Sequence, residues 1–188
     1  MRTRIRLAAL AAGAAVLAVG GTMPTSASAT TPVSAPGTRY QLLAPSGITY
    51  LPANVDLQPT ASGTWANTGL QVTLPVAGTY ALDLNVRARL QAGPPVNTYM
   101  VARLWNVTSG AAVPNSERIL SQLIDYTAAG AGAIAKNTTS PISERITVTG
   151  PTTIRLQAQR VNAAGASTIA AIWSDGAGRT SFRFDRIS

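Results

Sequence analysis

Strict alternation of apolar and polar residues over Thr79–Gln91 constrains the fold more than any other feature of this sequence. One set of alternate positions is apolar: Tyr80, Leu82, Leu84, Val86, Ala88 and Leu90. The intervening positions are mostly polar, namely Thr79, Ala81, Asp83, Asn85, Arg87, Arg89 and Gln91. A period of two indicates a β-strand with one face in a core and the other in water. Such a strand is expected to have antiparallel neighbours, which disfavours a parallel α/β fold.

Shorter runs of the same kind recur between Pro, Gly, Asn and Ser residues, and no segment predicts a helix. This spacing is typical of a sandwich or barrel. Further strands are predicted at Leu70–Leu74, Tyr99–Val107, Glu117–Leu123, Ile142–Thr149, Thr153–Val161, Ser167–Trp173 and Thr180–Ile187, with weaker candidates at Tyr40–Leu43 and Ile48–Leu51. About ten strands predict an all-β protein, an antiparallel two-sheet jelly-roll sandwich.

Two connections between these strands stand out by composition. Ala128–Ala135 has very small side chains, which predicts a mobile loop that is either a binding loop or a neutral connection. Ser174-Asp175-Gly176 is interpreted as a hairpin connection rather than a metal site, because Asp-Gly supplies the positive φ that such turns require.

The N-terminus has the pattern of an export signal. Basic residues are followed by an uncharged apolar stretch and a small-residue cleavage site: Arg2, Arg4 and Arg6, then Leu7–Gly21, then Ala27-Ser28-Ala29. A membrane anchor is the alternative, but a spanning helix needs about 20 apolar residues and this run is followed by Pro24. We therefore predict a signal peptide over 1–29, a flexible lead-in over 30–38 and one jelly-roll domain over 39–188. The protein is expected to be secreted, with no stable membrane insertion after cleavage.

The chain contains no cysteine and no histidine. Their absence removes Ser-His-Asp and Cys-His catalysis and metal sites built on imidazole or thiolate. A glycosidase would need two carboxyl groups about 5 to 10 Å apart. Glu117 and Asp125, which flank one predicted strand, are the pair hardest to dismiss. Calcium-binding motifs are missing too, so we predict no enzymatic activity, no metal and no cofactor.

The net charge is +8, and loss of the signal removes three of the fifteen basic residues. The remaining twelve basic and seven acidic residues give +5 and are spread along the chain. A nucleic-acid-binding protein would show a basic stripe or an aromatic-studded groove, so no nucleic-acid partner is predicted. An exported domain without disulfides is held by burial, by sheet hydrogen bonds or by subunit contacts. Self-association of this domain is therefore one expectation.

The aromatic residues divide into core candidates and binding candidates. Tyr80, Phe182 and Phe184 lie on apolar alternations and are interpreted as core. Trp105 shares one strand face with Arg103, whereas Met100, Ala102 and Leu104 share the other. If the second face is the core, Trp105 points outward beside Arg103, which suits a sugar-stacking platform or a subunit interface. The alternative is a Trp buried in the other half of the sandwich, and the same ambiguity holds for Trp65 and Trp173. The candidate binding residues are Trp105, Arg103 and Trp173.

The segment Pro75-Val76-Ala77-Gly78-Thr79-Tyr80, followed by a long alternating strand, resembles the G-x-Y start of C1q/TNF-like jelly-roll domains. Later segments are similar in order: Arg103-Leu104, Asn115-Ser116-Glu117, Thr153-Ile154-Arg155-Leu156-Gln157-Ala158 and Arg179-Thr180-Ser181-Phe182. The resemblance covers roughly Gly63 to Ser188. It implies a ten-stranded sandwich, commonly trimeric, used for recognition at cell or particle surfaces, as in bacterial exported members. Gly78 and Tyr80 would be structural, and no binding residue transfers.

The sequence departs from that family by lacking a collagen-like stalk and the acidic calcium cluster of some members. The leading hypothesis is a secreted, non-enzymatic binding or assembly module that forms a trimer through one apolar face of the sandwich. Its further partner would be an unknown extracellular protein or glycan. The alternative is a monomeric carbohydrate-binding β-sandwich that uses exposed Trp or Tyr.

Overall fold

The computed structural model describes residues 45–188, which form eleven strands and no helix. The strands are β1 Ser46–Tyr50, β2 Val55–Asp56, β3 Ala66–Leu74, β4 Gly78–Ala92, β5 Val96–Asn106, β6 Ala111–Ala112, β7 Arg118–Asp125, β8 Ile134–Val148, β9 Thr152–Ala164, β10 Ser167–Ile172 and β11 Ser181–Arg186. The predicted signal peptide, the lead-in and the candidate strand Tyr40–Leu43 lie outside the described residues. Within residues 45–188, no helix is long and apolar enough to cross a membrane.

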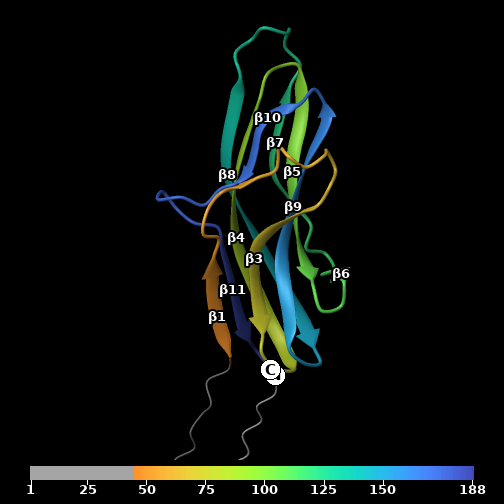
Figure 1. The fold of residues 1–188 in the computed structure, drawn as a ribbon, viewed down its shortest axis with the longest axis vertical. Coiled ribbons are helices and arrows are strands. Elements are labelled where there is room, and N and C mark those ends of the chain that lie inside the picture. Colours follow the sequence, from red (N-terminus) through yellow and green to blue (C-terminus); the bar gives the residue numbers. More distant parts are fainter. Residues whose placement is uncertain (1–44) are drawn as a thin grey trace, which may run out of the picture. The chain divides into compact units, whose positions relative to one another are not determined.

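Sheet A is built around β4, the strand that the alternation over Thr79–Gln91 predicted. β8 pairs antiparallel with β4 along its whole length, from Gly78 opposite Val148 to Ala92 opposite Ile134. On the other side of β4, β11 pairs with its first half and β10 with its second half (Figure 1). β1 extends the sheet beside β11, and β2 extends it beside β10. All these pairs are antiparallel, as the one-sided pattern of β4 requires.

Sheet B is arranged around β5 in the same way. β9 pairs with β5 on one side, and β7 and β6 pair with successive parts of β5 on the other. β3 completes the sheet next to β9. The two sheets together confirm the predicted antiparallel two-sheet sandwich of jelly-roll type.

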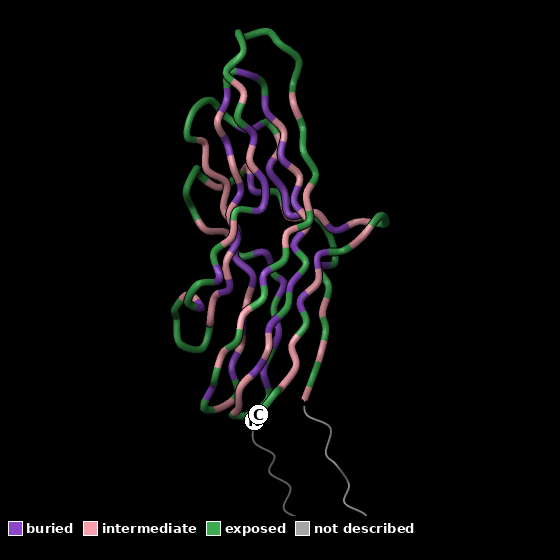
Figure 2. The backbone as a smooth tube through the Cα atoms, turned by 180° about the vertical axis from the view of Figure 1, so that it is seen from behind, coloured by how far each residue is buried: buried purple, intermediate pink, exposed green. Residues whose placement is uncertain are grey.

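The core lies between the inward faces of the two sheets. The six apolar positions of the β4 alternation are all at most 1% exposed. They face a layer from sheet B that is fully buried: Met100, Ala102, Leu104, Ile154, Leu156 and Ala158. Buried and less buried residues therefore alternate along the central strands (Figure 2). Removing these apolar faces from water supplies the main driving force for folding, at about 25 cal/mol per Å².

β8 is longer than predicted, because it begins at Ile134 instead of Ile142. The residues at the end of the predicted loop Ala128–Ala135 are therefore paired, with Ala135 opposite Gln91. Within sheet A, β8 pairs with β4 alone, and its outward residues are exposed. An edge strand needs no continuous apolar run and tolerates a residue such as Pro141. The apolar pattern was therefore too weak to reveal the first half of β8. The two-residue strands β2 and β6 were also missed.

The turn after β10 differs in detail from its prediction. The left-handed region is occupied by Gly178, with φ of 154°, and not by Gly176. Asp175 forms the turn with its side chain, because its Oδ1 accepts a hydrogen bond from the Ala177 amide at 3.0 Å. Asp175 and Gly178 also exchange backbone hydrogen bonds of 2.9 and 3.2 Å. An aspartate that bonds to the backbone two residues on closes such a turn without help from the next glycine.

Candidate functional site

The outer face of sheet B carries a stack of one arginine and two tryptophans. Because Met100, Ala102 and Leu104 are fully buried, Arg103 and Trp105 point away from the core. The Arg103 guanidinium carbon lies 4.8 Å from the ring centre of Trp105 and 4.0 Å from that of Trp65. Both indoles are half-buried. Each separation is within the range of a cation–π contact, so Arg103 holds the two rings in place.

Two further contacts fix the Arg103 side chain. Its Nε donates to Gln157 Oε1 at 2.9 Å, and Gln157 Nε2 in turn donates to Asn67 Oδ1 at 2.9 Å. One of its terminal nitrogens lies 3.5 Å from the carboxylate of Glu117, whose side chain is 57% exposed. Asn67, Gln157 and Arg103 are opposite one another on β3, β9 and β5. The stack therefore depends on the pairing of three strands. Because that pairing is not visible in the sequence, the sequence could not decide whether Trp65 is buried or points outward.

Beside this stack lies a group of outward apolar residues, here called the sheet-B patch: Tyr99, Val101, Ile119, Ile124 and Val161. Ile119 and Ile124 are 60% and 57% exposed. Val101 pairs with Ile119, and Tyr99 pairs with Val161, so these side chains are neighbours on one face. Tyr126, which follows β7 and is 66% exposed, adds another exposed apolar ring. Sequence reasoning missed this patch because it assigned no face to the residues of β7.

Trp173 lies on the opposite side of the sandwich, on the outer face of sheet A. Its ring centre is 5.0 Å from the guanidinium carbon of Arg89, and its Nε1 donates to Asp175. Asp175 also accepts from Arg87 at 2.9 Å. This hydrogen bond from the Arg87 guanidinium is the main reason that the pKa of Asp175 lies below its ordinary value of 3.8. The three candidate binding residues thus lie at two sites, Arg103 with Trp105 and Trp173 alone.

The four residues predicted to be structural lie at one end of sheet A. Tyr80 and Phe182 are fully buried, and Phe184 is half-buried with its ring 6.0 Å from that of Tyr80 in an edge arrangement. The Tyr80 hydroxyl donates to the Val76 carbonyl at 3.0 Å, which satisfies its polar end. Gly78 has φ of 151°, and a Cβ there would overlap the Arg186 side chain.

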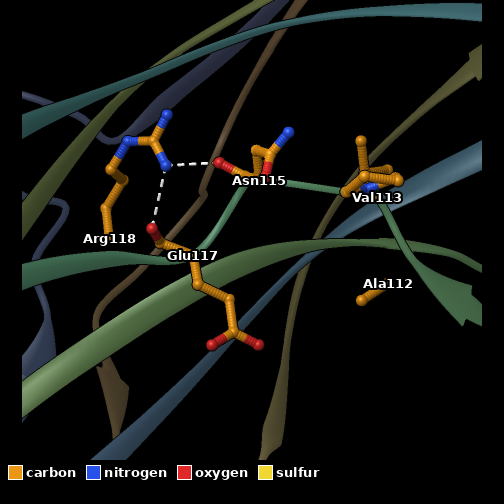
Figure 3. Close-up of a pocket in the computed structure, with 6 residues that line it drawn as sticks. Ala112, Val113, Asn115, Glu117 and Arg118 are labelled. Atoms are coloured by element: carbon orange, nitrogen blue, oxygen red, sulfur yellow. Dashed lines mark hydrogen bonds between the residues drawn. The ribbon is translucent and has the colours of Figure 1, made fainter.

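The loop from Ala112 to Arg118 lines an open pocket of about 460 Å³ (Figure 3). Arg118 donates to the carbonyls of Asn115 and Glu117, and its other terminal nitrogen binds Glu144 of β8 at 2.8 Å. Arg118 therefore ties this loop to the edge of sheet A. Both terminal nitrogens of Arg118 are thus bonded within the protein.

The carboxylates are mostly paired with arginine. Ion pairs join Arg87 to Asp175, Arg103 to Glu117, Arg118 to Glu144 and Arg183 to Asp185. Glu117 and Asp125 stand at opposite ends of β7, which places them about 25 Å apart at the usual rise of a strand. That separation is far larger than a glycosidase pair needs. Among the residues that the structure describes, no group of three or more acidic side chains could hold a metal ion.

The strand pairing defines the class of this protein, an all-β antiparallel sandwich of jelly-roll type. No protein-family model matches the chain. Comparison with curated proteins also gives no match. Among solved structures, it is similar to that of infectious bursal disease virus Gx strain, with 13% identity over 77% of this chain and 38% of that chain and a TM-score of 0.38. The VP2 subviral particle of that virus gives 9% identity, the same coverages and a TM-score of 0.38. This chain therefore spans less than two fifths of the length of either.

Proposed function

We propose that this chain is an exported, non-enzymatic binding or assembly module that self-associates through the outer face of sheet B. The observation that carries the proposal is the sheet-B patch, whose members Ile119 and Ile124 are more than half exposed. Isolated exposed apolar residues are ordinary, but contiguous ones on a flat face mark interaction sites. The strand pairing sets Ile119 beside Val101 and Val161 beside Tyr99, and Ile124 lies on the same face opposite Asn97.

The composition of this face favours association with a second copy. None of the five patch residues is charged, and depletion of charge is the mark of an interface centre. Arg103, Trp65 and Trp105 lie next along the same face, and Arg and Trp are enriched among residues that dominate interface energies. The stack formed by these three side chains is already ordered, so association would cost little further side-chain entropy.

The C1q/TNF-like resemblance supports a homotrimer as the assembled form. The proposed role of this trimer is recognition outside the cell or the building of an extracellular structure. Export is supported by the basic, apolar and small-residue segments over 1–29. Sequencing the N-terminus of the protein recovered outside the producing cells tests export, and a mature end near Thr30 is expected.

The absence of catalysis is supported by the residues available for acid–base chemistry. The chain has no histidine and no cysteine, and four of its seven carboxylates are paired with arginine. A carboxylate that is already bonded to an arginine is less available to a substrate as a general acid or base.

Light scattering coupled to size-exclusion chromatography tests the assembly. The wild-type protein is expected to have three times the chain mass, and the double variant Ile119→Lys, Ile124→Lys is expected to be monomeric. Two buried ammonium groups without partners would oppose association strongly. Ile48→Lys is the matched control, because Ile48 is 53% exposed on β1 of the other sheet. A wild-type monomer at every concentration would contradict self-association, and an equal loss of assembly in the control would contradict the assigned face.

A further inference from the structure

A small pocket lies on the outer face of sheet A, away from the sheet-B patch. It has a volume of about 120 Å³ and is bounded by β4, β8 and the residue that follows β10. Trp173, Arg87, Asn137 and Thr139 supply its polar and aromatic lining, and Ala88 and Thr138 complete it. Thr139 pairs with Arg87, and Asn137 pairs with Arg89, so the polar residues stand in adjacent rows of the sheet.

The aromatic wall of this pocket is fixed before any ligand arrives. The Trp173 amide donates to the Arg87 carbonyl at 2.8 Å, and the indole nitrogen donates to Asp175. Asp175 is held in turn by Arg87 at 2.9 Å. A ring anchored at its backbone and at its nitrogen loses little freedom when a ligand packs against it.

Several polar groups at the pocket have hydrogen-bonding capacity left over. Within residues 45–188, the side chains of Asn137 and Thr139 make no hydrogen bond to protein, and Arg87 uses one terminal nitrogen. An amide, a hydroxyl and a guanidinium beside a fixed indole are the groups that recognise a sugar ring. The indole covers the apolar C–H face, and the polar groups bond the ring hydroxyls.

The charge around the pocket favours an acidic ligand. Arg89 stacks on Trp173 but forms no ion pair with any carboxylate in residues 45–188. The exposed Arg179 is likewise outside the four ion pairs. Asp175, the acidic residue beside Trp173, is already paired with Arg87. Arg89 is thus a positioned guanidinium available to a carboxylate.

We propose that this pocket binds one saccharide unit that carries a carboxylate, such as a uronic acid. Trp173 forms the wall for the ring, and Asn137 and Thr139 bond its hydroxyls. Arg89, which stacks on Trp173 beside the pocket and outside its lining, binds the carboxylate. The volume is well below the roughly 300 to 1,000 Å³ of sites for drug-sized ligands, so the pocket holds no more than one sugar unit. This binding site goes beyond the proposed assembly and uses none of the sheet-B residues.

Isothermal titration with trigalacturonate, with maltotriose as the neutral trisaccharide, tests the site. Saturable binding of trigalacturonate is expected, with binding of maltotriose at least about tenfold weaker, as the loss of one charge-assisted contact predicts. Arg89→Gln should lower the affinity for trigalacturonate to about that of maltotriose. Asn137→Ala should weaken the binding of both sugars. Arg155→Gln is the control, because it removes the same charge from an arginine that bonds Gln71 on sheet B.

Four results would overturn the proposal. They are no binding of trigalacturonate, equal binding of the two sugars, an equal loss in Arg155→Gln, or tighter binding of a single-stranded oligonucleotide that displaces the sugar. Displacement of the sugar by the oligonucleotide would assign the site to nucleic acid. The variant Ile119→Lys, Ile124→Lys should keep its affinity for trigalacturonate, so the saccharide site and the assembly can fail independently.

Discussion

The guanidinium carbon of Arg103 lies 4.0 Å from the ring centre of Trp65, although Trp65 precedes β3 and Arg103 lies within β5. β9 separates these two strands, and Gln157 on β9 bonds both Arg103 and Asn67. The stack on the outer face therefore depends on the pairing of β3, β9 and β5. Changes to Arg103 should affect stability as well as any interface that this face forms.

Replacing Arg103 by Ala is expected to destabilise the fold by about 1–3 kcal/mol, because it removes two cation–π contacts and a hydrogen bond. Urea denaturation followed by circular dichroism measures the free energy of unfolding. The control Arg155→Ala should change it by less than about 0.5 kcal/mol, since Arg155 makes only exposed bonds to Gln71. Equal effects of the two substitutions would show that the stack contributes nothing beyond surface charge.

The hydroxyl and the ring of Tyr80 should contribute separately to stability. Tyr80→Phe removes only the hydrogen bond to the Val76 carbonyl and should cost about 0.5–1.5 kcal/mol. Tyr80→Ala leaves a cavity among fully buried residues and should cost about 3–5 kcal/mol. The same denaturation measurement distinguishes them. A Tyr80→Ala variant as stable as Tyr80→Phe would contradict the placement of this ring in the core.

Gly78 should tolerate no side chain. Its φ of 151° is disfavoured for other residues, and a Cβ would lie 2.5 Å from the Ser188 carbonyl oxygen. Gly78→Ala is expected to lower stability by more than about 1 kcal/mol, seen as a lower melting temperature in calorimetry. Gly176→Ala is the matched control, because nothing lies within 4 Å of a Cβ there. Equal melting temperatures of the two variants would contradict the close packing of the C-terminus on Gly78.

The turn after β10 should loosen in acid. The Arg87 hydrogen bond lowers the pKa of Asp175 below its ordinary value of 3.8. A group with a lowered folded pKa stabilises above its unfolded value, and that contribution disappears as the pH falls through the folded value. The contact from Trp173 to Asp175 should therefore persist as the pH falls to 3.8 and be lost only at a lower pH, where Asp175 becomes protonated. Carbon-detected NMR of the Asp175 carboxyl follows this titration, and Arg87→Gln should move its midpoint upward.

A strand of this structure could be predicted from the sequence when burial of one of its faces leaves an alternating pattern in its own residues. Thr79–Gln91 was predicted closely, because a central strand buries one face and the pattern must show it. Half of β8 was missed, because an edge strand with an exposed face needs no such pattern. The outward direction of Trp105 followed once the opposite face of β5 was taken as core, but its contact with Arg103 and Trp65 did not.

The sheet-B patch shows where the sequence alone is insufficient. β7 contains a bulge at Leu120, so that Ser121 pairs with Met100 while Ile119 pairs with Val101. Leu120 and Ser121 both face inward, and Ile119 and Ile124 are left outside. An extra residue in one strand reverses the alternation beyond it, and only pairing with the next strand shows where that happens.

By itself, then, the sequence determined the fold class, because alternation is a local property that each strand must satisfy to bury one face. It also determined which chemistry is open to the chain, since residues that are absent cannot be supplied by folding. Only the tertiary structure decided which aromatic and basic side chains meet. Arg103 with Trp65, and Arg89 with Trp173, are brought together by the register between strands distant in the chain.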